Sequence, residues 1–175
     1  MAVLPVLTYP NPRLKQISKP VAEVNDEVRA FIRDLEETMR AGPPSVGIAA
    51  PQVGRLERIV LLDVSMKPDI RHHGRVVLIN PEFIQQSGKT KGREGCLSVP
   101  DFLGNVVRSK KIIIRALDEA GEKRVYEMEG YEARAAQHEI DHLDGKLFLD
   151  RLVSRRHDLF SRNLNPDTSC EGQSV

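Results

Sequence analysis

The chain has 175 residues, of which 40% are hydrophobic and 29% are charged, and this balance predicts one globular domain with a sizeable core. The formal net charge of +1 gives no general excess of positive charge for binding nucleic acid or an anionic membrane. No segment approaches the roughly 20 apolar residues of a membrane-spanning helix, and prolines interrupt the N-terminus, which does not resemble a signal peptide. We therefore expect a cytoplasmic protein.

The first half of the chain predicts one helix and several strands. Residues 1–24 are rich in proline and predict an extended segment. Asn25 is a favourable helix cap, and apolar residues then recur at helical spacing, so a helix is expected to run to about Ala41. Residues 45–54 (SVGIAAPQVG) are too rich in small side chains for an ordinary strand. Apolar runs predict strands at 58–64, 75–80 and 82–86.

The second half predicts a hairpin and a second helix. Residues 111–118 and 123–129 are expected to pair through a turn at Gly121. Residues 131–143 favour a helix, which Asp144-Gly145 should end. Helix, strands and helix in this order indicate an α+β fold rather than an alternating parallel one. We expect a single domain over residues 1–165 and a disordered tail over 166–175, with Cys170 as a free thiol.

The most informative motif, His138-Glu139-Ile140-Asp141-His142, lies in the second predicted helix. Histidines four residues apart share one helix face, so both imidazoles can bind a single cation. Glu139 can reach a water molecule beside that cation, where a carboxylate acts as a general base. The pattern arises by chance in roughly one such sequence in a hundred. The alternative is a surface helix with two unrelated histidines.

A catalytic zinc-like site usually has three protein ligands and an open position for water, so a third ligand is expected elsewhere. His157 is one candidate, although it lies in a basic stretch that should be exposed. Cys96 is the better candidate, because a thiolate is a strong ligand for iron or zinc. It lies in a compact, turn-like segment, residues 94–98 (EGCLS), ahead of the predicted hairpin. The alternative for Cys96 is a small, buried core residue.

Three segments together resemble the peptide deformylase family: SVGIAAPQ at 45–52, EGCLS at 94–98 and QHEIDHLDG at 137–145. Their order and separations fit that family, and the resemblance covers about residues 4–152. It implies antiparallel β-sheets packed around a central helix that bears the two histidines. It also implies a metal-dependent hydrolase that removes the N-formyl group from the N-terminal formyl-methionine of new proteins and releases formate.

The resemblance further implies a role for each motif residue. The metal ligands are Cys96, His138 and His142. Ferrous iron is implied as the native metal, and zinc, nickel or cobalt can occupy the same site. The catalytic groups are Glu139 as the proton carrier, and the Gln52 amide and the Leu97 N–H as oxyanion donors. The substrate backbone is bound by Gly47, Ile48 and Gly95, while Glu94 orients the ligand turn. The methionine pocket is implied to involve Ile48, Leu97 and Ala135.

The chain departs from the family pattern at two places near the implied groove. Ser45 replaces the first glycine of the usual Gly-x-Gly, where its side chain could crowd the entrance or change the backbone. Phe102 and Leu103 are apolar where relatives often carry polar groups. The basic C-terminal element is also short, which argues against a ribosome contact. We expect a monomer that acts on N-formylmethionyl nascent peptides and has neither DNA nor a membrane as a partner.

Three other functions remain open at the level of sequence. A metallopeptidase shares H-E-x-x-H, but the cysteine ligand and the Gln52 segment argue against it. A non-catalytic relative that binds peptide or ribosome would not need Glu139, which is present. A structural zinc site needs four protein ligands, and only three are evident.

Overall fold

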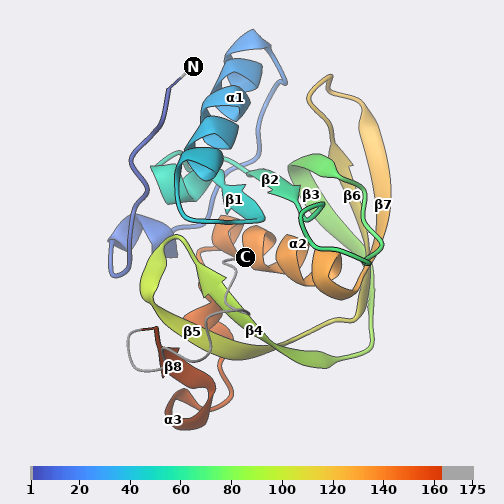
Figure 1. Cartoon of the computed structure of the whole chain (residues 1–175). Helices are drawn as coiled ribbons and strands as arrows, with labels where there is room; N and C mark the ends of the chain where they lie inside the picture. Colours follow the sequence, from blue (N-terminus) through green and yellow to red (C-terminus); the bar gives the residue numbers. More distant parts are fainter. Residues whose placement is uncertain (1, 163–175) are drawn as a thin grey trace.

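The computed structural model describes residues 2–162 and contains two β-sheets around a central helix (Figure 1). The five-stranded sheet is built, in order, from β1 (Gly47–Ala49), β2 (Ile59–Asp63), β3 (Arg75–Ser87), β6 (Lys111–Leu117) and β7 (Lys123–Glu129). The three-stranded sheet contains β4 (Thr90–Cys96), β5 (Val99–Arg108) and β8 (Leu159–Ser161). The α-helices are α1 (Asp26–Ala41), α2 (Gly130–Leu143) and α3 (Arg155–Asp158), and the 3-10 helices are η1 (Pro12–Lys15), η2 (Ala50–Val53) and η3 (Phe148–Arg151). Every pairing between these strands is antiparallel, which confirms the predicted α+β class.

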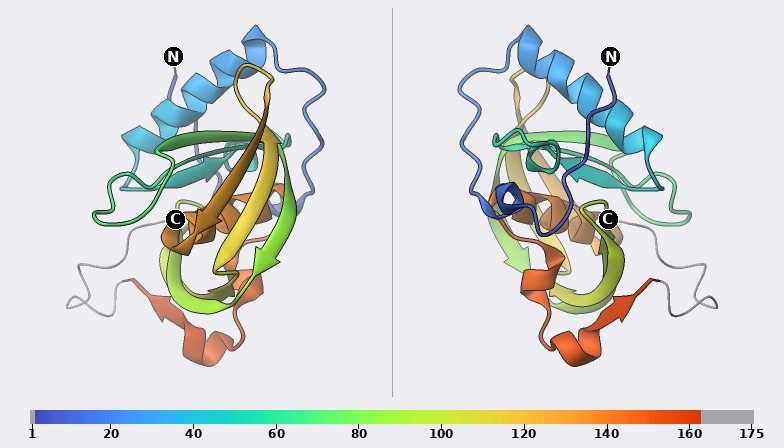
Figure 2. Two further views of the ribbon diagram at one scale, coloured as in Figure 1. Left: turned by 90° about the vertical axis from the view of Figure 1, so that its right-hand side faces the viewer. Right: turned by 90° about the vertical axis from the view of Figure 1, so that its left-hand side faces the viewer.

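Helices α1 and α2 cover opposite faces of the five-stranded sheet, as Figure 2 shows. Successive side chains of a strand point to opposite faces. In β2, Leu61 joins a cluster with Ile32 of α1, whereas Val60 and Leu62 join a cluster with Ile140 of α2. The apolar run of β2 is unbroken because both of its faces are buried. This places α2, with its histidines, under the sheet at the centre of the molecule.

The two main helices begin and end close to where the sequence predicts. The Asn25 side chain accepts a hydrogen bond of 3.0 Å from the N–H of Val28, and α1 ends at Ala41 before the glycine-proline segment. Helix α2 starts one residue before the predicted range, at Gly130. Residues 45–54, expected not to form an ordinary strand, form the three-residue edge strand β1 followed by η2.

Two strand predictions need correction. The segments 75–80 and 82–86 are one continuous strand, β3, with register irregularities after Ile79 and Phe83. Asn80 has a φ of 53°, and in the sequence the Asn80-Pro81 pair interrupts the apolar run, which is why two strands were predicted. The EGCLS segment is not an isolated turn, because Glu94-Gly95-Cys96 ends β4 and only Leu97 and Ser98 turn into β5.

The extended N-terminal segment forms main-chain hydrogen bonds with both η2 and the turn between β4 and β5. The N–H of Leu7 donates to the carbonyl of Gln52 at 2.7 Å, and the N–H of Tyr9 donates to the carbonyl of Ser98 at 2.7 Å. These bonds join η2 to the β4–β5 turn across a long stretch of sequence. Hydropathy does not reveal them, because they depend on main-chain groups alone.

The described C-terminal part folds back onto the smaller sheet. Strand β8 pairs with β5, so that Leu103 lies opposite Phe160. No helix in the described part of the chain is long and apolar enough to span a membrane. The predicted tail at 166–175, including Cys170, lies outside the described residues.

Gly145, which follows α2, can be used to test how closely the end of this helix packs against the N-terminal segment. Its φ is +72°, and a Cβ there would collide with the backbone carbonyl of Lys15. Gly74 has the same φ of +72° but open space around it. In urea unfolding we expect Gly74→Ala to lose about 1 kcal/mol of stability, the cost of a left-handed alanine. Gly145→Ala should lose about 3 kcal/mol or more, because the chain at Lys15 must move. Equal losses would contradict this packing.

Candidate active site

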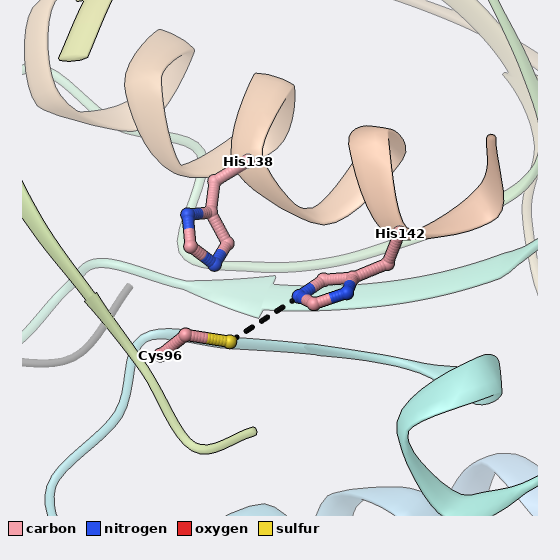
Figure 3. A group of neighbouring side chains, drawn as sticks. All are labelled: Cys96, His138 and His142. Carbon is pink, nitrogen blue, oxygen red and sulfur yellow. Dashed lines mark hydrogen bonds between the residues drawn. The ribbon is translucent and has the colours of Figure 1, made fainter. Parts of the chain in front are cut away.

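Cys96, His138 and His142 converge in the space between α2 and the end of β4 (Figure 3). All three side chains are buried, and one ligand atom from each lies within 4.8 Å of the others. The Cys96 Sγ and the His142 Nε2 are 3.4 Å apart. The structure therefore brings together the two helix histidines and the predicted third ligand. His157, the alternative ligand, is exposed on α3 and is not part of this group.

The donor set fits a borderline or soft divalent cation. A thiol and two imidazoles are the ligands that zinc and ferrous iron accept. The His138 Nε2 is buried and has no hydrogen-bond partner among the described residues, so this atom is free to bind a cation. Burial lowers the pKa of His142 to about 3, which keeps that imidazole neutral, as a ligand must be. Three protein donors leave room for a further ligand such as water.

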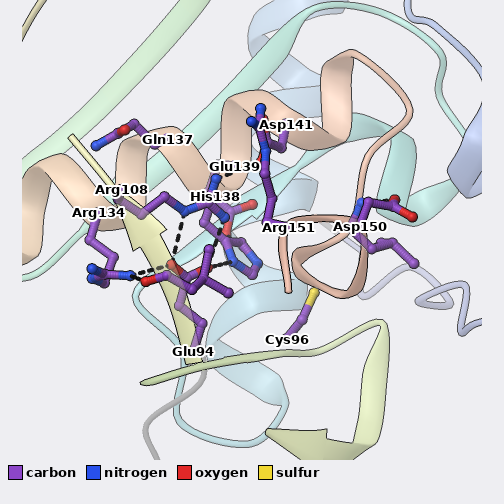
Figure 4. Close-up of polar contacts among 12 residues, drawn as sticks. Glu94, Cys96, Arg108, Arg134, Gln137, His138, Glu139, Asp141, Asp150 and Arg151 are labelled. Carbon is purple, nitrogen blue, oxygen red and sulfur yellow. Dashed lines mark hydrogen bonds and ion pairs between the residues drawn. The ribbon is translucent and has the colours of Figure 1, made fainter. Parts of the chain in front are cut away.

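Glu94 fixes the orientation of His138 (Figure 4). Its carboxylate is fully buried, and the Nδ1 of His138 lies 2.8 Å from Oε1. Burial would raise the pKa of Glu94, but hydrogen bonds from Arg108 and His138 outweigh it and hold the pKa well below its ordinary value. An ionised carboxylate only accepts hydrogen bonds, so the Nδ1 must carry the proton. The Nε2 is then the ring atom left to act as a ligand beside Cys96 and His142.

Two buried arginines neutralise Glu94. Arg108 donates to it through Nε at 2.9 Å and Nη2 at 2.8 Å, and Arg134 donates through Nη1 at 2.7 Å. Arg108 also reaches Asp141 at 2.6 Å, and Arg151 donates to the same carboxylate at 2.8 Å. The ion pairs among these three arginines and two carboxylates thus connect β4, β5, α2 and η3 next to His138.

Sequence reasoning assigned no site role to Arg108 or Arg134, and treated Arg151 only as part of a basic C-terminal element. For Arg134 a signal was available. It precedes His138 by four residues, so it had to share the helix face of the predicted ligand. Arg108 carried no such signal, because its partner Glu94 is reached only through the β4–β5 pairing.

Glu139 lies beside the ligand group and is fully buried. Burial raises its pKa to about 7, and neither carboxylate oxygen has a hydrogen-bond partner among the described residues. Gly47 of β1 makes room for it, since a Cβ at Gly47 would lie 2.8 Å from the Glu139 Cγ. A carboxyl group whose pKa lies near neutral pH can both accept and return a proton.

Gln52 is also buried and points at the cysteine. Its Oε1 accepts a hydrogen bond of 2.9 Å from the N–H of Ala49. That bond turns the Nε2 toward Ser98 Oγ, at 3.0 Å, and Cys96 Sγ, at 3.6 Å. Leu97, in the turn after Cys96, belongs to the same neighbourhood.

The residues implied to form the methionine pocket belong to two of the buried apolar clusters. Ile48 is fully buried in the cluster beneath α1, against which Leu97 also packs. Ala135 belongs to a different cluster, with Val46 and Val64. Gly95 lies close to Leu103, whose Cδ2 would be 2.8 Å from an added Cβ.

The family model for polypeptide deformylases matches residues 3–158. A peptide deformylase of Alkalilimnicola ehrlichii is 43% identical over 94% of this chain and 90% of its own length. A peptide deformylase of Acidobacterium capsulatum is 44% identical over 94% of this chain and 95% of its own length. The structure of a peptide deformylase of Ehrlichia chaffeensis with actinonin gives a TM-score of 0.82 at 37% identity, covering 89% of this chain and 92% of that one. The structure of a peptide deformylase of Thermotoga maritima gives a TM-score of 0.80 at 35% identity, covering 88% of this chain and 100% of that one.

The buried charge cluster behind the histidines should be sensitive to the loss of one arginine. Arg108→Met leaves Glu94 and Asp141 with a charge that their remaining partners balance less well, and we expect a loss of about 3 kcal/mol in urea unfolding. The matched control is Arg124→Met. Arg124 pairs with Asp118 at the surface, with 58% of its side chain exposed, so that change should cost much less stability than Arg108→Met. Similar losses in the two variants would show that the Arg108 pairs contribute no more than surface pairs.

Proposed function

The chain belongs to the polypeptide deformylase family, metal-dependent hydrolases that remove N-formyl groups from nascent peptides, and we propose that Cys96, His138 and His142 hold the metal for this reaction. The observation that carries the proposal is the convergence of these three buried donors beside the buried carboxyl of Glu139. It supports an open catalytic site rather than a structural one, which would need four protein ligands.

We propose Fe²⁺ as the native cation, with Zn²⁺, Ni²⁺ or Co²⁺ as alternatives that accept the same donors. When bound, a divalent cation supplies positive charge that polarises the formyl carbonyl and makes water more acidic. The remaining chemistry belongs to the side chains and main chain around it.

Glu139 is the proposed proton carrier. It takes a proton from water as the water oxygen bonds to the formyl carbon. It then gives a proton to the amine nitrogen as the carbon–nitrogen bond breaks, so the products are formate and a free N-terminus. A pKa of about 7 suits both transfers, because the group is neither too weak a base nor too weak an acid at neutral pH.

The Gln52 amide and the Leu97 N–H are the proposed donors to the developing oxyanion. The bond from Ala49 to the Gln52 Oε1 fixes the amide before substrate arrives. Donors that are already in position stabilise the transition state without reorganising, which is the main source of their effect.

Gly47 and Gly95 are proposed to bind the peptide backbone, with Ile48 next to Gly47 on the same edge strand. Gly47 lies on the edge strand β1 against Glu139, and Gly95 directly precedes Cys96 near the end of β4. We further propose that the protein is a cytoplasmic monomer with a single domain over residues 1–165. Helix α3 has only four residues and is followed by β8, so it offers little surface for a ribosome contact.

Replacing the proton carrier tests the mechanism. With iron loaded anaerobically, we expect Glu139→Gln to lower kcat for formate release from a formyl-Met peptide by about 100-fold or more, because the base is lost. The Cys96–His138–His142 donors remain, so the iron content should not change. Glu127→Gln, a change on the exposed face of β7, is the control and should leave turnover unaltered. Unchanged turnover in Glu139→Gln would remove this residue from the mechanism, and new peptide fragments in place of formate would indicate a peptidase.

The metal assignment has its own test. Protein purified without oxygen should contain about one iron per chain by elemental analysis, and a chelator should lower its Tm because the cation binds the folded state. Cys96→Ala should lose most of the bound iron, whereas Cys170→Ala, the other cysteine of the chain, should keep it. Full iron content in Cys96→Ala would contradict a cysteine ligand.

A further inference from the structure

We propose that the Ser45 hydroxyl occupies the backbone edge that a bound peptide needs, so that substrate must displace it and binds more weakly than it would beside glycine or alanine. The inference rests on the proposed function, since it takes Gly47 to be the place where the peptide backbone binds. It makes Ser45 a residue that tunes affinity, without contact with the reacting atoms.

The unpaired edge of β1 is defined by its register. Strand β1 is the outermost strand of its sheet, and Gly47 lies opposite Leu62 of β2. The N–H of Asp63 donates to the carbonyl of Val46 at 2.8 Å, so Val46 faces β2. Backbone groups alternate in direction along an antiparallel strand. The N–H and the carbonyl of Gly47 therefore point away from β2, toward the open edge.

Ser45 satisfies both of these outward groups from within the chain. Its hydroxyl donates to the carbonyl of Gly47 at 2.9 Å, and the N–H of Gly47 approaches the same oxygen at 3.4 Å. A hydroxyl can donate one hydrogen bond and accept others, so the two contacts are compatible. Short polar side chains commonly compete in this way with strand pairing.

This edge runs directly past the proposed proton carrier. The Gly47 Cα is so close to Glu139 that a Cβ would lie 2.8 Å from the Cγ. An extended peptide that bonds to Gly47 therefore passes beside Glu139 and the ligand group. Peptides often bind by adding a strand to a free sheet edge through main-chain hydrogen bonds. Here the Ser45 hydroxyl already bonds to both groups, so the peptide must compete with it for the first of these bonds.

The expected effect is on binding and not on chemistry. One exchanged hydrogen bond changes affinity modestly, so we expect Ser45→Ala and Ser45→Gly to lower KM about fivefold at unchanged kcat. Ser45→Thr keeps the hydroxyl and should stay near the wild-type KM. Ser87→Ala, at an exposed position at the end of β3, is the matched control for loss of a serine hydroxyl. An unchanged or higher KM in Ser45→Ala and Ser45→Gly would overturn the proposal.

A binding measurement separates this proposal from the proposed function. The product peptide Met-Ala-Ser can be titrated calorimetrically into nickel-loaded wild type and Ser45→Ala, and the variant should bind about fivefold more tightly. N-methylating the peptide amide that donates to Gly47 should abolish this gain, and peptides methylated at each amide in turn identify that amide. A gain that survives methylation at every amide would overturn the proposal. Wild type that binds the peptide but releases no formate would refute the proposed reaction and leave the binding comparison intact.

Discussion

The rest of the site depends on the hydrogen bonds that the buried carboxylate of Glu94 accepts. It sits in the core with no exposed surface, and it is ionised because Arg108, Arg134 and His138 all bond to it. An isolated buried charge would be prohibitively unstable, so each of these partners is required. Because an ionised carboxylate can only accept, it sets the tautomer of His138 and so the direction of its lone pair. The charge of Glu94, which is not itself a candidate ligand, thus determines how His138 is presented to a cation.

The same cluster explains how a helix can present polar residues inside the protein. One side of α2 packs its small Ala133 and Ala136 against the apolar sheet. The other side carries charge, and the β4–β5 hairpin covers it through Arg108 and Asp141 rather than through apolar packing. Apolar packing positions the helix, and the ion pairs position the hairpin that brings Cys96. The space between them stays polar, buried and able to hold a cation.

Much of this arrangement could be predicted from local sequence. Helical spacing and the Asn25 cap predicted α1, and the four-residue spacing of His138 and His142 predicted which face of α2 carries the candidate metal ligands. The resemblance to the deformylases supplied Cys96 as the predicted third ligand. Strand β4 was missed because its residues KGREG lack an apolar alternation, and they are held by pairing with β5 instead. The continuity of β3 was missed because the Asn80-Pro81 pair interrupts its apolar run. The sequence showed Ser45 as a departure from the family's Gly-x-Gly pattern, but its hydrogen bond to Gly47 is visible only in the structure.

We propose that the ionised Glu94 carboxylate organises the candidate metal site by fixing the tautomer of His138. The most direct test is the cation affinity of Glu94→Gln, measured by competition with a chromogenic chelator on folded protein. The variant keeps the shape of the side chain but lacks the charge that fixes the His138 tautomer. We predict roughly 10- to 100-fold weaker binding of Zn²⁺, the range found when residues that support metal ligands are changed. An affinity equal to that of the wild type would contradict the account.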